Sequence, residues 1–348
     1  MKKIIFCLFI LLVAVTGCKF KSKNKLESND VEATYSINYN DDFYKIHKPY
    51  KKGVGKNYIL NSNVVDYDVT TIEKGLIQIS TNTFDVDKYY YEEGQYLTKS
   101  KLKDLLSKKE LNDYGKKKIN GKKVTPMIIA GIYEKNFVNK KGDIKGISLG
   151  LVLNRYHSYD SNNNYITLDK DETIDFGKKA GNELVKYMRK KFKLKNIPIM
   201  VALYLEASPN SSVGGNYLYY GVTEDKDIKY KYINQKSFFM NNKNVKDIDS
   251  TNYNNFIKFD ESIRDFDNSI YISGLGHFNG NDLTKLEINV TKSYYSYGDL
   301  LYLNQLISDK VVKYFKKIKV IVRVNSINSV NAYIVKEPKQ TTTDVFIY

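Results

Sequence analysis

The amino-acid sequence predicts an α+β fold, in which helices pack on a mixed or antiparallel sheet. Hydrophobic residues alternate with polar or small residues over residues 147–154, which is the period of a strand. They recur with helical spacing over residues 174–192. Residues 197–205 are then almost wholly apolar, as expected of a strand that is covered on both faces. Together these stretches form a strand, helix, strand unit over residues 144–206.

The helix of this unit has an apolar face, and its charged residues are distributed to complement the helix dipole. Asp171, Glu172 and Asp175 lie at its start and Arg189 and Lys190 near its end, so the charges complement the helix dipole. The residues that share its apolar face are Ile174, Gly177, Ala180, Gly181, Leu184, Met188 and Phe192.

A second strand, helix, strand unit is predicted over residues 283–325. Its first strand contains Leu286, Ile288 and Val290, and its last contains Val320, Val322 and Val324. The helix between them has Leu300, Leu303, Leu306, Ile307, Val311 and Phe315 on one face. In both units a loop rich in tyrosine and serine joins the first strand to the helix. This pattern indicates an internal repeat, and the alternative is that a common connection occurs twice by chance.

The flanking segments are less regular. Ile77, Ile79 and Phe84, followed by tyrosines 89–91, predict a strand and a turn. We expect a short helix over residues 100–106, a buried segment over 127–132, a weak helix over 253–266 and a C-terminal hairpin formed by 332–335 and 345–348.

Residues 1–17 have the pattern of a lipoprotein signal peptide. Lys2 and Lys3 give a positive start, and residues 4–15 form an apolar run. This run is shorter than the roughly 20 apolar residues that span a bilayer. The motif Val15-Thr16-Gly17-Cys18 places the cleavage between Gly17 and Cys18.

Cleavage there would leave Cys18 at the new N-terminus, with its thiol carrying a diacylglycerol group. Two or three acyl chains on one residue anchor a protein stably to a membrane. We therefore expect a protein anchored by lipid to the cell membrane, on its extracytoplasmic face. The alternative is an ordinary secretory signal. The other cysteine, Cys7, lies inside the signal peptide, so no disulfide framework is predicted.

Residues 18–56 are polar and predict a flexible tether between the lipid and the body. The body is expected to comprise residues 57–348.

The formal net charge of +16 raises the question of a polyanionic partner. No run of five consecutive lysines or arginines occurs. Lys, Asn, Ile and Tyr are abundant and Trp is absent, which is the residue bias of proteins encoded by an AT-rich genome. A solvated basic surface is the preferred interpretation, so no specific nucleic-acid partner is predicted.

The sequence predicts no catalytic residues, no metal site and no cofactor. Its histidines, His47, His157 and His277, lack the spacing of zinc ligands, and no Ser-x-x-Lys motif is accompanied by a Lys-Thr-Gly. An enzyme remains a third hypothesis. It would require His157 or His277 to lie near a carboxylate in a cleft.

Two other motifs are weak. Gly274-Leu275-Gly276 is interpreted as an ordinary turn, not a nucleotide site. The polar segment that begins at Asp160 resembles a calcium loop, but Tyr165 stands where such a loop requires glycine, so a polar connection to the next helix is preferred.

Aromatic side chains provide the candidate ligand-binding surface. Tyr217 and Tyr219 follow a pair of glycines, and Tyr294 and Tyr295 lie in the loop of the second unit. These tyrosines could stack on a peptide, a glycan or a wall polymer. The alternative is that most of the 31 tyrosines border the core with their hydroxyls in water.

The order of several segments resembles one protein family. The segments are 84–89, 94–97, 145–151, 197–199, Tyr294-Tyr295 with Gly298, and the ending 345–348. Together they are similar to the CamS family, the sex-pheromone-precursor lipoproteins of staphylococci and related Gram-positive bacteria.

The resemblance implies a non-enzymatic surface lipoprotein whose signal peptide is trimmed to a short apolar pheromone. Responsive enterococcal cells sense such a peptide, which promotes plasmid conjugation. In this chain the pheromone segment would be Leu11, Leu12, Val13, Ala14, Val15, Thr16 and Gly17. Its apolar order differs from that of the family's active peptide. The contrasting hypothesis is an extracytoplasmic binding lipoprotein for a peptide, glycan or cell-wall polymer.

Overall fold

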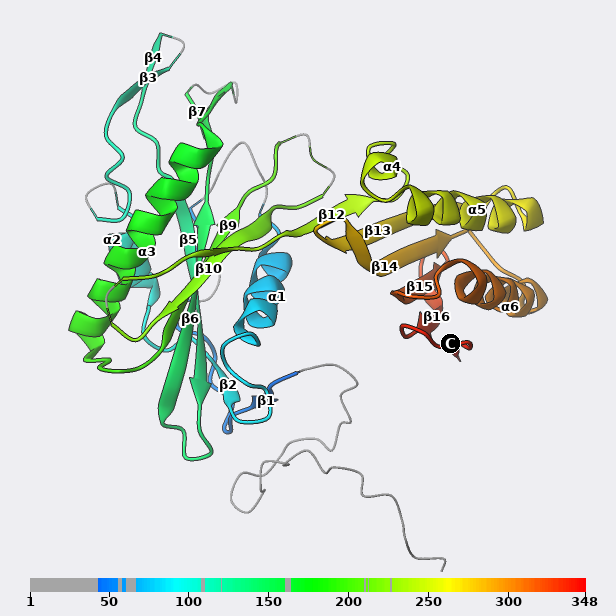
Figure 1. The fold of residues 1–348 in the computed structure, drawn as a ribbon, viewed down its shortest axis with the longest axis horizontal. Coiled ribbons are helices and arrows are strands. Elements are labelled where there is room, and N and C mark those ends of the chain that lie inside the picture. The colour runs from blue at the N-terminus through cyan, green and yellow to red at the C-terminus, as the bar shows by residue number, and fades with distance from the viewer. Residues whose placement is uncertain are drawn as a thin grey trace, which may run out of the picture.

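The computed structural model describes residues 43–348, except 56–57, 61–66, 108–109, 120, 160–163, 210, 212 and 226. Within these residues the chain forms two lobes, each built on its own mixed sheet (Figure 1). The first lobe extends to the end of β11 at Tyr232, and the second begins with β12 at Gln235. The predicted α+β class is therefore confirmed, and the body that was expected as one unit comprises two lobes.

The described part of the first lobe contains a seven-stranded sheet with helices on both faces. Its strands, in spatial order, are β1 (Lys45–Ile46), β2 (Tyr90–Glu93), β5 (Ile129–Val138), β6 (Ile144–Leu153), β9 (Ile199–Leu205), β10 (Asn216–Thr223) and β11 (Lys231–Tyr232). Helices α2 (Lys99–Leu105) and α3 (Lys170–Phe192) pack on one face, and α1 (Val69–Ser80) on the other. Two small ribbons lie outside this sheet: β3 (Lys117–Ile119) with β4 (Lys122–Val124), and β7 (Tyr156–Ser158) with β8 (Tyr165–Thr167).

Coverage of both faces explains the sequence of the central strands. Every residue of β9 is buried, which confirms the expectation for the apolar run at 197–205. Helix α3 begins at the cap Asp169, whose carboxylate accepts the amides of Asp171 and Glu172. Its small residues allow close packing, since a Cβ at Gly177 would lie 2.8 Å from the side chain of Leu153 on β6.

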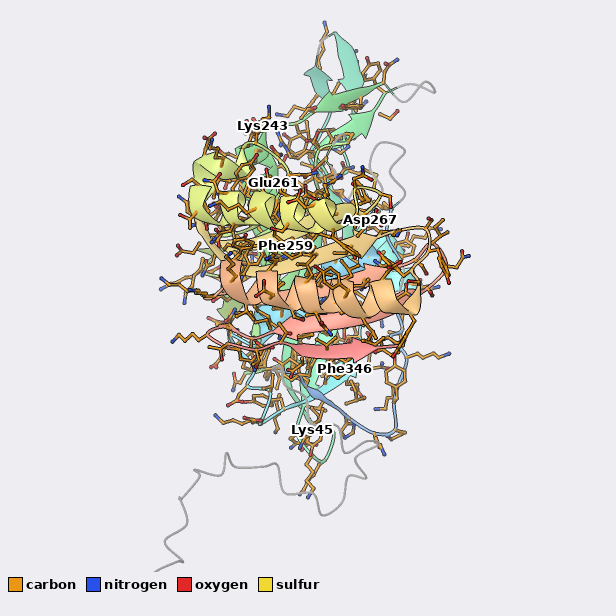
Figure 2. All side chains as sticks on the ribbon, turned by 90° about the vertical axis from the view of Figure 1, so that its right-hand side faces the viewer. Lys45, Lys243, Phe259, Glu261, Asp267 and Phe346 are labelled. Atoms are coloured by element: carbon orange, nitrogen blue, oxygen red, sulfur yellow. The ribbon has the colours of Figure 1, made fainter. Side chains whose placement is uncertain are left out.

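The second lobe has two layers. The sheet described there has the order β12 (Gln235–Phe239), β13 (Tyr271–Asn279), β14 (Asp282–Thr291), β15 (Lys319–Asn325), β16 (Val330–Lys336) and β17 (Asp344–Ile347). Helices α4 (Val245–Ile248), α5 (Ser250–Phe266) and α6 (Tyr297–Tyr314) belong to this lobe, and α5 and α6 cover one face of the sheet (Figure 2). Among the described residues no helix of this lobe covers the other face, so residues along these strands alternate between buried and partly exposed.

Both predicted strand, helix, strand units are present. β6 and β9 pair in parallel with α3 between them, and β14 and β15 pair in parallel with α6 between them. Each parallel pair is flanked on both sides by an antiparallel partner, namely β5 and β10 in the first lobe and β13 and β16 in the second. The two lobes thus share one local strand order.

The other elements agree with the sequence in part. The helices near 100–106 and 253–266 and the C-terminal hairpin are confirmed as α2, α5 and β16–β17. The prediction of a strand at Ile77 and Ile79 is wrong, because both residues lie in α1. This helix is capped by Asp68 and buries Ile72, Leu76 and Ile79, which have helical spacing.

Two further expectations differ from the structure. Gly274 and Gly276 lie within β13 and not in a turn, and a Cβ at Gly274 would collide with the ring of Phe256 on α5. The sheet of the first lobe also begins before residue 57, because Lys45 and Ile46 of β1 pair with β2.

Candidate functional site

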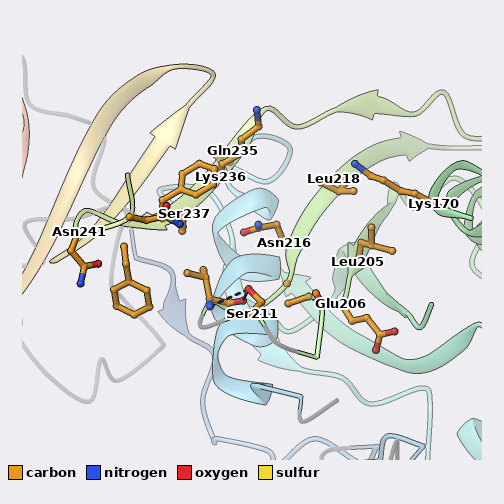
Figure 3. Close-up of a pocket in the computed structure, with 18 of the residues that line it drawn as sticks. Lys170, Leu205, Glu206, Ser211, Asn216, Leu218, Gln235, Lys236, Ser237 and Asn241 are labelled. Carbon is orange, nitrogen blue, oxygen red and sulfur yellow. Dashed lines mark hydrogen bonds between the residues drawn. The ribbon is translucent and has the colours of Figure 1, made fainter. Parts of the chain in front are cut away.

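A cleft of about 830 Å³ lies between the two lobes. One wall comes from the end of β9 and the start of β10, and the other from β12 with the adjoining end of β13 (Figure 3). All five residues of β12 line it. Its volume is in the range of ligand sites, which often lie between domains.

Glu206 is the buried acidic group of this cleft. It directly follows β9, and its carboxylate accepts hydrogen bonds from the backbone amides of Arg155 and Tyr156. Burial raises the pKa of this carboxyl to about 7, against the opposing effect of the two amides. A carboxyl that titrates near neutral pH in a cleft is a typical feature of a functional site.

The remaining polar groups of the cleft come from both lobes. Lys170, the first residue of α3, and Lys236 on β12 contribute ammonium groups. Asn216, Gln235, Asn241 and Asn242 contribute amides. The cleft can therefore donate hydrogen bonds to a ligand and accept them from it.

Aromatic residues provide the apolar part of the cleft. Tyr232 and Tyr271 are 51% and 61% exposed, and Phe238 and Phe239 are half-buried. Exposed aromatic rings next to amides and ammonium groups can bind a ligand that is both apolar and polar.

A second hollow, of about 350 Å³, lies between α1 and the uncovered face of the second sheet. It contains Ser237, His277 and Glu287 from three adjacent strands. The Ser237 hydroxyl lies 3.0 Å from Nδ1 of His277, and Nε2 of His277 lies 3.5 Å from the Glu287 carboxylate. This is the arrangement of a histidine and a carboxylate that the enzyme hypothesis requires.

Other contacts oppose a catalytic role for this cluster. Lys285 forms an ion pair of 2.6 Å with the same oxygen of Glu287, so the carboxylate is shared between two partners. The contacts of Glu287 with His277 and Lys285 lower the pKa of this carboxyl. We interpret the cluster as a cross-strand electrostatic contact.

The first lobe contains a buried ion cluster. The Lys135 ammonium on β5 lies 2.8 Å from Glu73 on α1 and 2.9 Å from Glu93 on β2. The neighbouring Glu134 accepts the amides of Gln95, Tyr96 and Leu97, and burial raises its pKa. The adjacent hollow measures about 20 Å³, and a space of this size is filled by about one water molecule.

The candidate tyrosines of β10 face opposite sides of the first sheet. Tyr217 is buried against α1, and its hydroxyl donates a 3.0 Å hydrogen bond to the carbonyl of Ile72. A register shift between the two residues turns Tyr219 to the other face, where it packs near α3 beneath the ammonium of Lys178. Tyr217 contributes to the lining of the hollow of about 350 Å³ between α1 and the second sheet.

The candidate tyrosines of the second unit belong to the other lobe. Tyr294 is 73% exposed, whereas Tyr295 is buried against the core of the second lobe. Both precede α6, so the structure does not bring them together with Tyr217 and Tyr219 on β10.

The three histidines lie apart. His47 follows β1, His157 is on β7, and His277 is on β13. His157 is buried, which lowers its pKa to about 4, and its Nε2 lies 3.2 Å from the carbonyl of Asn154. In the described part of the chain, no three His, Cys, Asp or Glu side chains gather so that they could hold a metal ion.

Glu206 is not among the residues predicted from the sequence, although its position carries a signal. Glu206 directly follows the apolar run of β9. A charged residue next to a fully buried strand is rarely placed there by core packing, so it is a candidate for a functional role. Cys18, the cleavage site and residues 11–17 lie outside the described residues. Among the helices that the structure describes, none is long and apolar enough to cross a membrane.

Comparisons with known proteins give one consistent result. The family model described as CamS sex pheromone cAM373 precursor matches residues 50–342. A crystal structure of a sex pheromone precursor from Lactobacillus salivarius subsp. salivarius UCC118 has the same fold, with a TM-score of 0.77 at 23% identity, over 90% of this chain and 98% of that chain.

The structure of the C-terminal domain of the sex pheromone staph-cAM373 precursor from Staphylococcus aureus is also similar. It matches with a TM-score of 0.69 at 25% identity, over 80% of this chain and 96% of that chain. A search of curated protein sequences gave no match.

Proposed function

The chain belongs to the CamS family of sex pheromone precursors, and from this premise we propose that it is a lipid-anchored surface protein whose cleaved signal peptide yields a short peptide pheromone. The observation that carries the proposal is the combination of a family match over residues 50–342 with the motif Val15-Thr16-Gly17-Cys18 at the N-terminus. In this proposal Cys18 divides the chain into two products.

The product after the cut is the lipoprotein. Acylated Cys18 holds it on the extracytoplasmic face of the cell membrane, and the polar residues that follow separate the body from the lipid. The body acts as a non-enzymatic protein, and no cofactor is assigned to it.

The product before the cut is the peptide. Residues 11–17 are Leu-Leu-Val-Ala-Val-Thr-Gly, which contain no charged side chain. A short peptide without charged side chains crosses a bilayer at a lower free-energy cost than a charged one, because burial of charge in hydrocarbon is costly. We propose that this segment promotes plasmid conjugation in responsive cells.

Mass spectrometry of the membrane fraction tests the anchor. We expect the wild-type protein to lack residues 1–17 and to carry acyl mass, and Cys18→Ala to retain residues 1–17 without acyl mass. Cys7→Ala is the matched control, since it removes the other cysteine of the chain and leaves the motif intact. A wild-type protein that keeps residues 1–17 and has no acyl group would refute both the anchor and the peptide.

A synthetic peptide tests the signal. Residues 11–17 are added to responsive enterococcal recipients, and clumping and plasmid transfer are measured against a scrambled peptide of the same composition. Induction by the native order alone supports the proposal, and equal responses to both peptides contradict it.

The cleft between the lobes favours a second candidate function, a binding lipoprotein for a peptide, glycan or wall polymer. Its exposed rings, Tyr232 and Tyr271, lie beside amides and lysines in a volume suited to a ligand. Sedimentation of the protein with isolated cell wall, compared between wild type and Tyr232→Ala, tests this function. Tyr302→Ala is the control, because this tyrosine on α6 is 53% exposed and does not line the cleft.

A further inference from the structure

The outer edge of β12 presents backbone groups to the cleft. In the antiparallel pairing with β13, the amide of Met240 donates to Gly274 O at 2.8 Å and the amide of Gly280 donates to Asn234 O at 2.6 Å. Hydrogen-bonded pairs alternate along an antiparallel ladder. The even-numbered residues of β12 therefore bond to β13, and Gln235, Ser237 and Phe239 direct their amides and carbonyls outward.

These outward groups are largely unpaired. The carbonyl of Phe239 accepts the amide of Asn242, but among the described residues no hydrogen bond uses the backbone of Gln235 or Ser237 on this side. β12 is the first strand in the sheet order, and all five of its residues line the cleft. An edge of this kind is a template on which another extended segment can pair.

The surroundings of the edge suit the side chains of an added strand. Side chains of a strand point alternately to two sides. Leu205, Leu218 and Tyr232 from the first lobe and Phe238 from the second provide apolar contacts within the same cleft. Lys170 and Lys236 provide ammonium groups that can bind a C-terminal carboxylate.

We propose that the edge of β12 binds an extended peptide as an added strand, and that its occupant is the released segment of residues 11–17 of this same chain. The proposal rests on the proposed function, which supplies this peptide. The segment has no proline and no charged side chain, and it contains Val13, Val15 and Thr16, which favour strands. Its seven residues, when extended, span about 23 Å, enough to pass along the whole of β12. Its end at Gly17 supplies the carboxylate for one of the two lysines.

The protein is purified from the membrane fraction, cleaved or uncleaved, and placed in nanodiscs. Calorimetric titration of synthetic residues 11–17 into it tests the proposal, with empty nanodiscs as the control for partition into lipid. Ser237→Pro removes an outward amide and blocks the edge, and proline is tolerated at such an edge position. Ser237→Ala keeps the backbone and removes only the hydroxyl that contacts His277. We expect wild type and Ser237→Ala to bind equally, and Ser237→Pro to bind at least about tenfold more weakly.

Two peptide variants make the test independent of the folding of Ser237→Pro. One is N-methylated at Val13 and Val15 and the other at Leu12 and Ala14. Because alternate amides of a strand point to opposite edges, one variant should lose at least about tenfold in affinity and the other should retain it. Equal affinity of the two peptides, or equal loss in Ser237→Ala and Ser237→Pro, would overturn strand addition. Binding of soluble wall glycan without binding of the peptide would also overturn it.

The added peptide is synthetic, so this result does not depend on processing in the cell. Failure of processing is detected by the mass of the membrane protein, and failure of strand addition by the titration. The two outcomes are therefore separable.

Discussion

Ser237 and His277 face each other across β12 and β13, with the hydroxyl 3.0 Å from Nδ1 of the imidazole. The pair lies on the face of the second sheet that helices leave uncovered, beside the ion pair of Lys285 and Glu287. This neighbourhood decides whether the serine is a nucleophile or a structural residue.

We predict that Ser237 is not an activated nucleophile, because Glu287 is held by Lys285 as well as by His277. A fluorophosphonate probe should leave the intact mass of the protein unchanged. Stoichiometric labelling that disappears in Ser237→Ala, but persists in the control Ser273→Ala, would show that the body is an enzyme.

Glu206→Gln should change how stability depends on pH. Burial raises the pKa of Glu206 from 4.5 to about 7, so the folded state holds its proton to higher pH than the unfolded state does. Wild-type stability therefore falls as pH rises from about 4.5 to about 7. The amide variant lacks this loss, and the stability difference, variant minus wild type, should increase by about 3 kcal/mol between pH 4 and pH 8. Denaturant unfolding at the two pH values measures it. A pH-independent difference would contradict the raised pKa.

Tyr217→Phe should lower the free energy of unfolding by about 1 kcal/mol, because it removes the hydrogen bond to the Ile72 carbonyl. Tyr217→Ala should cost about 3–5 kcal/mol, since it also leaves a cavity against α1. The exposed Tyr294→Phe is the control and should be neutral. An unchanged stability in Tyr217→Ala would mean that this side chain is free to serve a ligand.

Lys135→Ala should destabilise the first lobe by about 3–5 kcal/mol, because it leaves Glu73 and Glu93 without their shared cation. The control is Lys186→Ala, which removes an ammonium from an exposed pair with Glu183 and should cause no measurable change. Thermal unfolding of both variants tests the comparison. Similar melting temperatures would show that the buried cluster adds nothing to stability.

Local periodicity was sufficient to predict the elements whose burial is regular. Helix α3 and strand β9 were predicted because a helix face and a doubly covered strand each leave a simple hydrophobic pattern. Helix α1 was missed, because Ile77 and Ile79 alternate locally, whereas its buried face is formed by Ile72, Leu76 and Ile79.

The candidate site was less predictable. The sequence of β12 is Gln-Lys-Ser-Phe-Phe, in which polar and apolar residues do not alternate. This segment forms a strand because it pairs with β13. The cleft combines residues near 206–216 with residues 235–242, and no local pattern relates the two lobes. Tyr217 was predicted to be an accessible ligand-binding tyrosine, but it is buried. Its hydroxyl donates a hydrogen bond to the Ile72 carbonyl, which allows this burial.

The separate cores of the two lobes have a consequence for cooperativity. The buried clusters on the first sheet and the cluster on the second contain different residues, and the chain passes from one lobe to the other between β11 and β12. We therefore predict that the two lobes unfold as separate units, so that unfolding of the whole body is not two-state. Glu206, Tyr217 and Lys135 belong to the first unit, so substitutions at these positions should move one calorimetric transition and leave the other in place.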